Sequence, residues 1–494
     1  MAAFVGVVNA STLFLETDND SLWQAAYDTL RYQDPTFERN AWTKWDGTVR
    51  MFNKKNGTFP SGLLSMMLKL CKDYEDKVDI EPLLKNLVRD ISREDIQEWV
   101  DNLNVSSGGN PIKPYDYQVE ALYYSVKYTR YLALAATSAG KSLMQYMKSR
   151  FWLDMMADEA KILIVVPTLQ LTQQLYKDFK DYSQLNGWDT DAFVHVAGDG
   201  VSPYTRKRIV ICTWQTLKNQ DREFFQPFNF LMGDEAHTFS SESLDYISSS
   251  CINCWQRVGL TGTLRRNDPN HKIRVCKIFG DSKRLVTTKQ LQDRGLATKT
   301  VVNMIVMSYP TEQRRKWRND CTLEKETKII CGYEPRNKIL VNLGRKLKGN
   351  SLFLFNNIET HLEVVKEEMI KAGLKPFVIH GEISVEEREE IKRYMETHDD
   401  VILLASYGTT STGISIKKLH NLVFAFPSKS NIRIQQSIGR MLRIHDSKDI
   451  AFIYDLIDEM KFDGRRNRTM EWAAERLDIY REEGQTIKTI KVDI

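Results

Sequence analysis

Residues 131–142 read Tyr-Leu-Ala-Leu-Ala-Ala-Thr-Ser-Ala-Gly-Lys-Ser, an apolar run that passes into small residues and ends in a Lys-Ser pair. The pattern predicts a buried strand over 131–136, a short loop and then a helix. Small residues let backbone N–H groups close around phosphate oxygens, and a helix N-terminus adds partial positive charge. The stretch is therefore typical of a P-loop, with Ala135 in place of the usual first glycine.

This loop predicts a site for the phosphates of ATP. Lys141 is expected to meet the β- and γ-phosphates, and the hydroxyl of Ser142 is expected to bind Mg²⁺. Backbone groups before them would surround the phosphates, so the predicted nucleotide-binding set is Thr137, Ser138, Ala139, Gly140, Lys141 and Ser142. For this motif by itself, a strand-to-helix turn with an exposed lysine is the structural alternative.

A second apolar strand delivers two acids at its carboxyl end. Residues 230–237 read Phe-Leu-Met-Gly-Asp-Glu-Ala-His, and parallel sheets place their ligands at such ends. Asp234 is expected to hold the Mg²⁺, and Glu235 to orient the water that attacks the γ-phosphate. A solvated acidic strand end is the alternative, but the upstream Gly-Lys-Ser favours the catalytic interpretation.

Two arginines near the C-terminus are spaced to share one helix face. Residues 436–443 read Gln-Ser-Ile-Gly-Arg-Met-Leu-Arg, so Arg440 and Arg443 are three residues apart. The planar, always charged guanidinium matches the spread charge of a phosphoryl-transfer transition state. We therefore interpret the pair as catalytic, with a salt-bridged surface helix as the alternative.

Short apolar runs alternate with helical stretches over most of the chain. The alternation predicts parallel sheets wrapped by helices, in two α/β domains that follow a small α+β N-terminal domain. The predicted strands are 131–136, 161–166, 208–212, 230–233 and 257–260 in the first domain, and 352–355, 375–379, 401–404, 422–426 and 450–454 in the second.

The expected organisation has five parts, in line with a length of 494 residues and about 150 residues per domain. A stretch rich in Ser, Gly, Asn and Pro at 105–114 marks the first boundary. The polar stretch between the sheets is read as a connector, or as an extension of the first α/β domain. The parts are an N-terminal domain over 1–105, a first α/β domain over 110–285, a connector over 286–335, a second α/β domain over 336–460 and a helical C-terminal tail over 461–494.

Charge, cysteine content and apolar runs exclude several classes of protein. Lys and Arg total 69 against 65 Asp and Glu, so nucleic-acid affinity must come from local basic patches. Seven cysteines form no dense framework, which suits a reducing cytoplasm, and Cys251-x-x-Cys254 lacks further zinc ligands. The apolar N-terminus up to Leu15 is expected to be a first strand and not a signal peptide. The longest apolar runs fall far short of the ~20 residues that cross a bilayer, so no membrane segment is expected.

In this order, the Lys-Ser pair, the Asp-Glu-Ala-His quartet and residues 436–443 resemble the motifs of superfamily 2 helicases and translocases, of DEAH type. The resemblance covers about residues 110–455. It implies two RecA-like motor domains that close on ATP, so that arginines of the second complete a site built by the first. It also implies that Thr261-Gly262-Thr263 couples hydrolysis to motion. It adds three nucleotide contacts: Gln118, which looks like the glutamine that recognises adenine, Gly413 and Gln436.

The same resemblance implies a nucleic-acid interface of hydroxyl, backbone and basic groups, which suit a phosphate backbone. The matching residues are Pro167, Thr168, Thr213, Trp214, Gln215, His380, Gly381, Ser406 and Thr409. Basic clusters at 206–208, 265–266, 314–318 and 465–468 are further candidates, with a solvated surface as the alternative for each. Trp317, within 314–318, could stack on a base or pack against the connector.

A narrower similarity lies in the N-terminal domain. Trp45-Asp46-Gly47 is followed by an apolar, basic strand and by Phe-Pro-Ser-Gly-Leu at 59–63. Joined to this motor, the pattern is similar to the phage UvsW-type helicases, which unwind forks, Holliday junctions and R-loops. The resemblance implies a DNA-binding N-terminal domain and a monomer that acts on branched DNA in the cytoplasm of a phage-infected bacterial cell. A tight turn pinned by a buried Trp45 is the structural alternative.

Three other functions compete with a branched-DNA helicase. A translocating subunit would track along duplex DNA without separating strands, and an RNA helicase would prefer RNA. A regulatory clamp would bind ATP as a switch and scarcely hydrolyse it, but a clamp would need neither Glu235 nor the arginine pair.

Overall fold

The computed structural model describes residues 3–34, 37, 45–74, 77–156, 160–262, 264, 268–319, 322–408, 416–429, 434, 437–439 and 441–494. The chain forms two compact units, Met1–Ala135 with Ala139–Val286 and Ala136–Ser138 with Thr287–Ile494. No helix in these described ranges is long and apolar enough to cross a bilayer.

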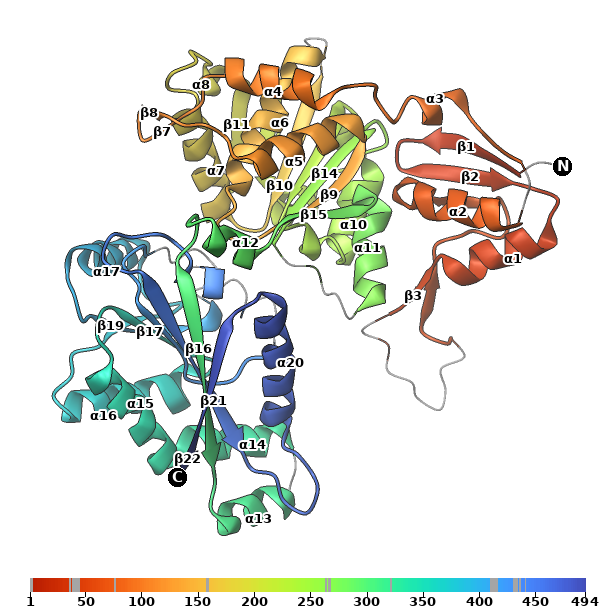
Figure 1. Cartoon of the computed structure of the whole chain (residues 1–494). Helices are drawn as coiled ribbons and strands as arrows, with labels where there is room; N and C mark the ends of the chain where they lie inside the picture. The colour runs from red at the N-terminus through yellow and green to blue at the C-terminus, as the bar shows by residue number, and fades with distance from the viewer. Residues whose placement is uncertain are drawn as a thin grey trace. The chain divides into compact units, whose positions relative to one another are not determined.

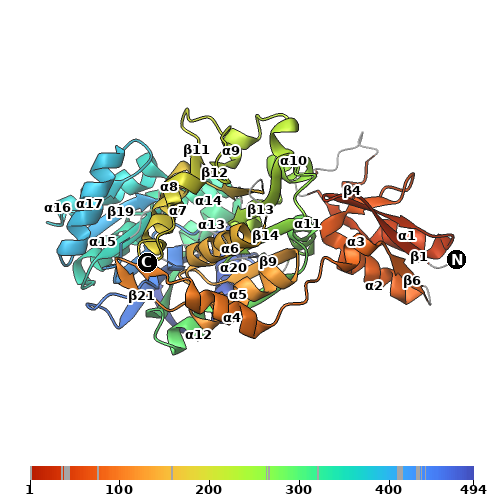
Figure 2. The same ribbon diagram turned by 90° about the horizontal axis from the view of Figure 1, so that it is seen from above.

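The first unit begins with a small mixed sheet in the order β5-β2-β1-β6, beside which helices α1 and α2 lie (Figures 1 and 2). The apolar N-terminus, expected to be one strand, is an antiparallel hairpin that turns at Ala10 and Ser11. The elements are β1 (Ala3–Asn9), β2 (Thr12–Glu16), α1 (Asp20–Thr29), β3 (Arg31–Gln33), β4 (Thr48–Arg50), β5 (Thr58–Pro60), η1 (Ser61–Leu63), α2 (Leu64–Tyr74), β6 (Val78–Ile80), α3 (Pro82–Lys85) and α4 (Arg93–Asn102).

A seven-stranded parallel sheet follows, in the order β11-β12-β10-β13-β14-β9-β15. All five predicted strands are present, whereas the edge strands β11 and β15 were missed because their half-exposed residues form no continuous apolar run. The strands are β9 (Arg130–Ala135), β10 (Lys161–Val166), β11 (Val194–Ala197), β12 (Ile209–Thr213), β13 (Phe228–Asp234), β14 (Gln256–Thr261) and β15 (Ser282–Val286). The helices are α5 (Asp116–Lys127), α6 (Lys141–Met155), α7 (Leu169–Tyr182), α8 (Thr190–Phe193), α9 (Trp214–Leu217), η2 (Glu223–Phe225), η3 (Ala236–Thr238), α10 (Glu242–Ser250) and α11 (Pro269–Phe279).

The second unit contains another seven-stranded parallel sheet, in the order β18-β19-β17-β20-β21-β16-β22. The strands are β16 (Lys299–Ser308), β17 (Ser351–Phe355), β18 (Phe377–Ile379), β19 (Ile402–Ser406), β20 (Asn421–Phe424), β21 (Ile450–Glu459) and β22 (Thr486–Asp493). The helices are α12 (Thr288–Asp293), α13 (Thr311–Asn319), α14 (Leu323–Gly332), α15 (Glu334–Lys346), η4 (Ile358–Leu362), α16 (Glu363–Lys371), α17 (Val385–Thr397) and α20 (Arg468–Glu482). The two parallel sheets confirm the predicted α/β class.

Two strands of this second sheet come from segments expected to be something else. The stretch 286–335, expected to be a connector, supplies β16, which lies between β21 and β22. The stretch 461–494, expected to be a helical tail, contains α20 but ends in β22. β22 is mostly exposed and shows no clear local strand signal, whereas β16 contains an apolar run over 301–307 that was available in the sequence but was read as part of a polar stretch.

The predicted linker at 105–114 is fixed to the first sheet's helical layer. It forms a short hairpin of β7 (Ser106–Ser107) and β8 (Asn110–Pro111). The hydroxyl of Ser106 donates to the carbonyl of Asp181 at 2.5 Å, and the backbone N–H of Gly108 donates to the Asp181 carboxylate at 2.8 Å. Its composition marks a break in regular structure, but these bonds hold the segment against α7.

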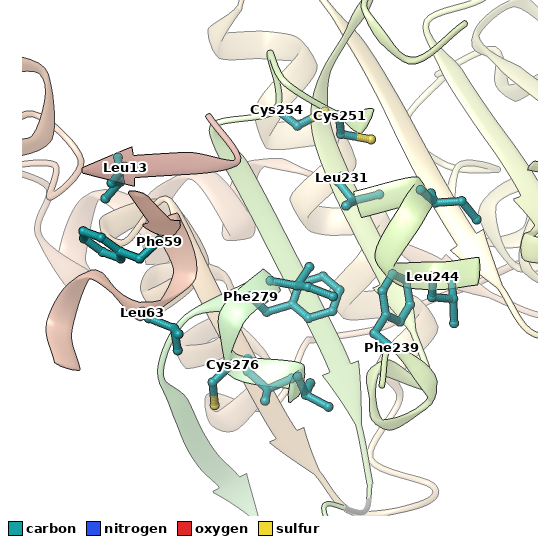
Figure 3. Packing of buried hydrophobic residues seen from close by; sticks show 14 of the residues in the cluster. Leu13, Phe59, Leu63, Leu231, Phe239, Leu244, Cys251, Cys254, Cys276 and Phe279 are labelled. Carbon is teal, nitrogen blue, oxygen red and sulfur yellow. The ribbon is translucent and has the colours of Figure 1, made fainter. Parts of the chain in front are cut away.

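The N-terminal sheet and the first parallel sheet share one core. Leu13, Phe59 and Leu63 belong to the same buried cluster as Cys276 and Phe279 (Figure 3). The contact is close: a Cβ on Gly62 would lie 2.4 Å from the carbonyl oxygen of Cys276. The N-terminal domain therefore packs directly on α11, the helix that precedes β15 of this sheet.

Two arginines reinforce that contact from neighbouring strands, where the half-buried Arg130 and the buried Arg257 face each other in register. Arg257 donates to the hydroxyl of Ser11 at 2.5 Å and to the carbonyls of Cys251 and Cys254 at 2.8 and 3.0 Å. Arg130 donates to the carbonyl of Ala10. Burial lowers the pKa of both guanidinium groups. The Cys-x-x-Cys segment thus serves this junction through its carbonyls.

Candidate active site

The predicted nucleotide residues of the first sheet gather at one edge. β13, β14 and β9 are consecutive neighbours, with Asp234 opposite Leu260 and Thr261 opposite Leu134. Because parallel strands end at the same edge of a sheet, the loop after β9, the acids after β13 and Thr261 lie close together.

The loop after β9 has the backbone that a phosphate cradle needs. Gly140 precedes α6 with φ +74°, and Ser138 has φ +70°, which is uncommon for a residue with a Cβ. A Cβ on Gly140 would lie 2.4 Å from Nε2 of Gln118. The left-handed backbone favours glycine at 140, and a side chain there would displace the Gln118 amide.

Gln118 is buried and holds the loop from α5. Its Nε2 donates to the carbonyl of Ala139 at 2.9 Å, and its Oε1 accepts from the backbone N–H of Tyr115 at 2.9 Å. The side chain therefore braces the P-loop, and the recognition of adenine by Gln118 stays a prediction.

The Gln118→Ala variant should bind ATP about tenfold more weakly, because one buried hydrogen bond contributes about 0.5–1.5 kcal/mol and its loss also frees the loop. The Michaelis constant for ATP should rise with little change in turnover number. An unchanged Michaelis constant would contradict this bracing role.

Ser142 is held by a tyrosine that the sequence did not indicate. Its Oγ lies 2.8 Å from the phenolic oxygen of Tyr182 on α7. Burial raises the pKa of Tyr182 to about 12, so the phenol is neutral at physiological pH. The Ser142 hydroxyl and the Asp234 carboxylate are hard oxygen donors of the kind that Mg²⁺ prefers, so these residues fit the ion.

The two acids have pKa values shifted in opposite directions. Burial and the adjacent Glu235 carboxylate raise the pKa of Asp234 to about 6, although Lys141 and Gln145 oppose the shift. Burial also opposes ionisation of Glu235, but the hydrogen bond from His237 and the charge of Lys141 outweigh it and lower its pKa to about 2. Glu235 is therefore a fixed anion that can only accept hydrogen bonds. Its φ of +46° is strained for a residue with a side chain, as at many functional sites.

His237 joins the catalytic acid to the next strand. Its Nδ1 lies 3.3 Å from Oε2 of Glu235 and 2.9 Å from Oγ1 of the buried Thr261. His271 fixes His237 from the other side, with its Nε2 2.9 Å from the His237 carbonyl. No role was expected for His237 from the sequence, although its place in the Asp-Glu-Ala-His quartet was the available signal.

The predicted nucleic-acid residues of the first sheet also share one edge. Val166 and Thr213 are register partners, so Pro167 and Thr168 lie beside the segment that begins at Thr213. Nε2 of Gln215 donates to the carbonyl of Pro167 at 3.4 Å, which joins the two segments.

Their side chains are not equally available to a ligand. Thr213 is buried, and its hydroxyl lies 3.2 Å from that of Thr216. Trp214 is half-buried, with the Lys218 ammonium 5.6 Å from its ring centroid. Gln215 is exposed.

In the second unit, three of the eight predicted site residues lie at one edge of the sheet. A fourth is described elsewhere, and the other four lie outside the described residues. His380 and Gly381 follow β18, and Ser406 ends the adjacent β19. Arg443 is exposed, and its carbonyl accepts from Oγ1 of Thr298 at 2.8 Å. Four predicted residues lie outside the described part of the chain: Thr409, Gly413, Gln436 and Arg440.

The two tryptophans singled out from the sequence have different environments. Trp317 is 1% exposed and donates to Glu326 at 3.3 Å, so it packs inside its own unit and does not stack on a base. Trp45 is 45% exposed and donates to the carbonyl of Thr48 at 3.1 Å. Gly47 has φ +75°, as a tight turn requires, but burial of Trp45 does not pin that turn.

Comparison with known proteins places the chain in a family. The family described as "Type III restriction enzyme, res subunit" matches residues 111–266, and the "Helicase conserved C-terminal domain" matches residues 335–445. The ATP-dependent DNA helicase uvsW of Enterobacteria phage T4 is 36% identical over 420 residues, which cover 84% of this chain and 82% of the relative. The chain belongs to the UvsW family.

Solved structures agree with membership of the UvsW family. The crystal structure of T4 UvsW aligns over 100% of both chains with 30% identity and a TM-score of 0.53. A second crystal structure of the T4 UvsW helicase covers 57% of this chain and all of its own, with 30% identity and a TM-score of 0.52. The DNA-bound Type ISP restriction-modification enzyme LlaBIII, at 14% identity and a TM-score of 0.56, shares the fold over 87% of this chain and 36% of its own. The UvsW match confirms the tandem RecA-like domains behind an α+β N-terminal region.

Proposed function

We propose that this UvsW-family chain is an ATP-dependent DNA helicase that unwinds or branch-migrates branched DNA in replication, recombination and repair. The observation that supports this proposal most directly is the Glu235 carboxylate. It is joined through His237 to Thr261, at the strand edge that also holds the P-loop. The T4 relative is named an ATP-dependent DNA helicase, which supports the same activity here.

Hydrolysis would use the residues of this edge in distinct roles. Lys141 would pair with the β- and γ-phosphates, and Glu235 would accept a hydrogen bond from the attacking water and aim it at the γ-phosphate. Ser142 and Asp234 would hold Mg²⁺, which neutralises phosphate charge when bound. Arg440 and Arg443 are assigned to the charge of the transition state by resemblance.

Hydrolysis and DNA movement would be coupled through His237. Because its Nδ1 contacts both the Glu235 carboxylate and the Thr261 hydroxyl, a change around the γ-phosphate would reach Thr261 through this one side chain. We assign DNA contact to the edge formed by Pro167, Thr168 and Gln215. The relative's phage source supports an enzyme that works in the cytoplasm of an infected bacterial cell. The monomeric state stays an expectation.

The test is steady-state ATP hydrolysis with single-stranded DNA, plain duplex, a fork, a four-way junction and single-stranded RNA at one salt concentration. The fork and the junction should stimulate turnover most strongly. Equal stimulation by plain duplex would favour a translocase, and preference for RNA would favour an RNA helicase. Turnover below ~0.01 per second with every DNA would favour the regulatory clamp, since working enzymes manage ~1–1,000 per second.

A further inference from the structure

A hydroxyl pair joins the start of α6 to the end of α7. Ser142 is the second residue of α6, Tyr182 is the last residue of α7, and their side-chain oxygens lie 2.8 Å apart. A helical serine often donates instead to a carbonyl three or four residues back. The carbonyl three residues back, that of Ala139, already accepts from Gln118 at 2.9 Å. Within the described residues, the hydroxyl of Ser142 bonds to Tyr182.

The Tyr182 ring is fixed in place by its packing. Its centroid lies 5.6 Å from that of the buried Tyr146, which stands one turn after Ser142 on α6. Nδ2 of Asn186 donates to the Tyr146 hydroxyl at 3.0 Å and to the Tyr182 carbonyl at 3.4 Å. The phenolic oxygen is therefore held at one position beside the P-loop helix.

The residue before Tyr182 is tied to the hairpin between the N-terminal domain and α5. Three groups of this hairpin donate to Asp181, namely the hydroxyls of Ser106 and Ser107 at 2.5 and 3.1 Å and the backbone N–H of Gly108 at 2.8 Å. Figure 1 shows β7 and β8 beside α7. The end of α7 is thus bound on one side to the hairpin and on the other to the P-loop helix.

A serine that binds a metal ion as a neutral hydroxyl offers a lone pair to the ion and keeps its proton. That proton needs an acceptor, and partners of this second kind orient metal ligands. The pKa of Tyr182, raised to about 12 by burial, keeps the phenol neutral, and a neutral phenol can accept the proton of Ser142.

We propose that Tyr182 is a positioning residue for Mg²⁺, because its phenolic oxygen accepts the Ser142 proton and leaves a lone pair of Ser142 Oγ for the ion. The inference deepens the proposed function and rests on its assignment of Ser142 to Mg²⁺. Tyr182 acts only through Ser142 and touches neither the ion nor ATP.

The test is equilibrium binding of a fluorescent ATP analogue with a β,γ-imido bridge, titrated with Mg²⁺. In Tyr182→Phe the Mg²⁺ midpoint should rise about five- to tenfold, near the lower end of the effect of such partners on metal affinity. Binding of the analogue in EDTA should stay within about twofold of wild type. ATP hydrolysis should return to the wild-type turnover number when Mg²⁺ is saturating.

Tyr176→Phe is the matched control, since it removes a hydroxyl from the same helix. The Tyr176 hydroxyl donates to Asp191 and does not contact the P-loop. The Mg²⁺ midpoint of this variant should equal that of wild type. An unchanged midpoint in Tyr182→Phe, or an equal rise in both variants, would overturn the inference.

A double variant separates this inference from the proposed function. Ser142→Ala should raise the Mg²⁺ midpoint, and adding Tyr182→Phe should raise it no further, because both changes remove one interaction. A further rise as large as that of Tyr182→Phe alone would overturn the inference and leave the role of Ser142 standing. An unchanged midpoint in Ser142→Ala would refute the Mg²⁺ role that the proposed function gives to Ser142, and the inference with it.

Discussion

The Glu235→Gln variant should hydrolyse ATP about 10²- to 10⁴-fold more slowly than wild type, the range typical for loss of a positioned acid or base. Glutamine keeps the size of the side chain but removes the negative charge that aims the water. His237 and Lys141 lower the pKa of Glu235 despite its burial, so this charge is present throughout the physiological range. Single-turnover hydrolysis measures the loss.

Two comparisons separate a chemical defect from a structural one. Glu235→Gln should still bind ATP and fork DNA, because neither the P-loop nor the Pro167–Gln215 edge is altered. Glu223→Gln, which changes an exposed glutamate of η2, should hydrolyse ATP at the wild-type rate. Full ATP hydrolysis by Glu235→Gln would show that Glu235 does not have the assigned catalytic role.

The Arg336→Met variant should lower the free energy of unfolding of the second unit by about 3–5 kcal/mol, the usual cost of breaking a buried ion pair. Arg336 and Asp458 are both 0% exposed, and Nε of Arg336 lies 2.7 Å from Oδ1 of Asp458. Nη2 of Arg336 also donates to the carbonyl of Ala425 at 2.7 Å, and the Tyr309 hydroxyl donates to Asp458 at 2.8 Å. Methionine would leave the Asp458 carboxylate without its cation.

Lys338→Met is the matched control for this change. Lys338 lies two residues further along α15 and pairs with Glu334 at 2.7 Å, but both side chains are more than half exposed. Such surface pairs contribute about 0–1 kcal/mol. Urea unfolding of the full chain, with hydrogen exchange in β20 and β21, reports both variants. Equal stability of Arg336→Met and Lys338→Met would show that the buried pair contributes no more than the exposed one.

The sequence predicted the strands that form unbroken apolar runs and the motifs that directly follow such strands. β10 has the expected bounds because its six residues form an unbroken apolar run. The P-loop and the Asp-Glu pair were placed correctly on strand ends because small residues and paired acids directly follow apolar runs. In these places, local composition and tertiary position agree.

The remaining features depend on partners that a single stretch of sequence does not contain. β16 belongs to the second sheet because β21 and β22 lie beside it, about 150 and about 185 residues further along the chain. The Tyr182 contact with Ser142 and the His237 contact with Thr261 join residues 40 and 24 positions apart. The sequence left open whether Trp317 stacks on a base or packs inside the protein. Its burial and its hydrogen bond to Glu326 show that it packs inside.

The arginine pair at the base of β9 and β14 makes the N-terminal domain inseparable from the motor. In the described part of the chain, neither Arg130 nor Arg257 is paired with a carboxylate; both depend on carbonyl and hydroxyl oxygens, including those of Ala10 and Ser11. A chain cut at residue 105 would lose the oxygens of Ala10 and Ser11, which accept hydrogen bonds from the two adjacent guanidinium groups. The boundary that is visible in the sequence is thus no place at which the molecule can be divided. Any movement of the N-terminal domain therefore acts directly on the two strands that lead to the P-loop and to Thr261.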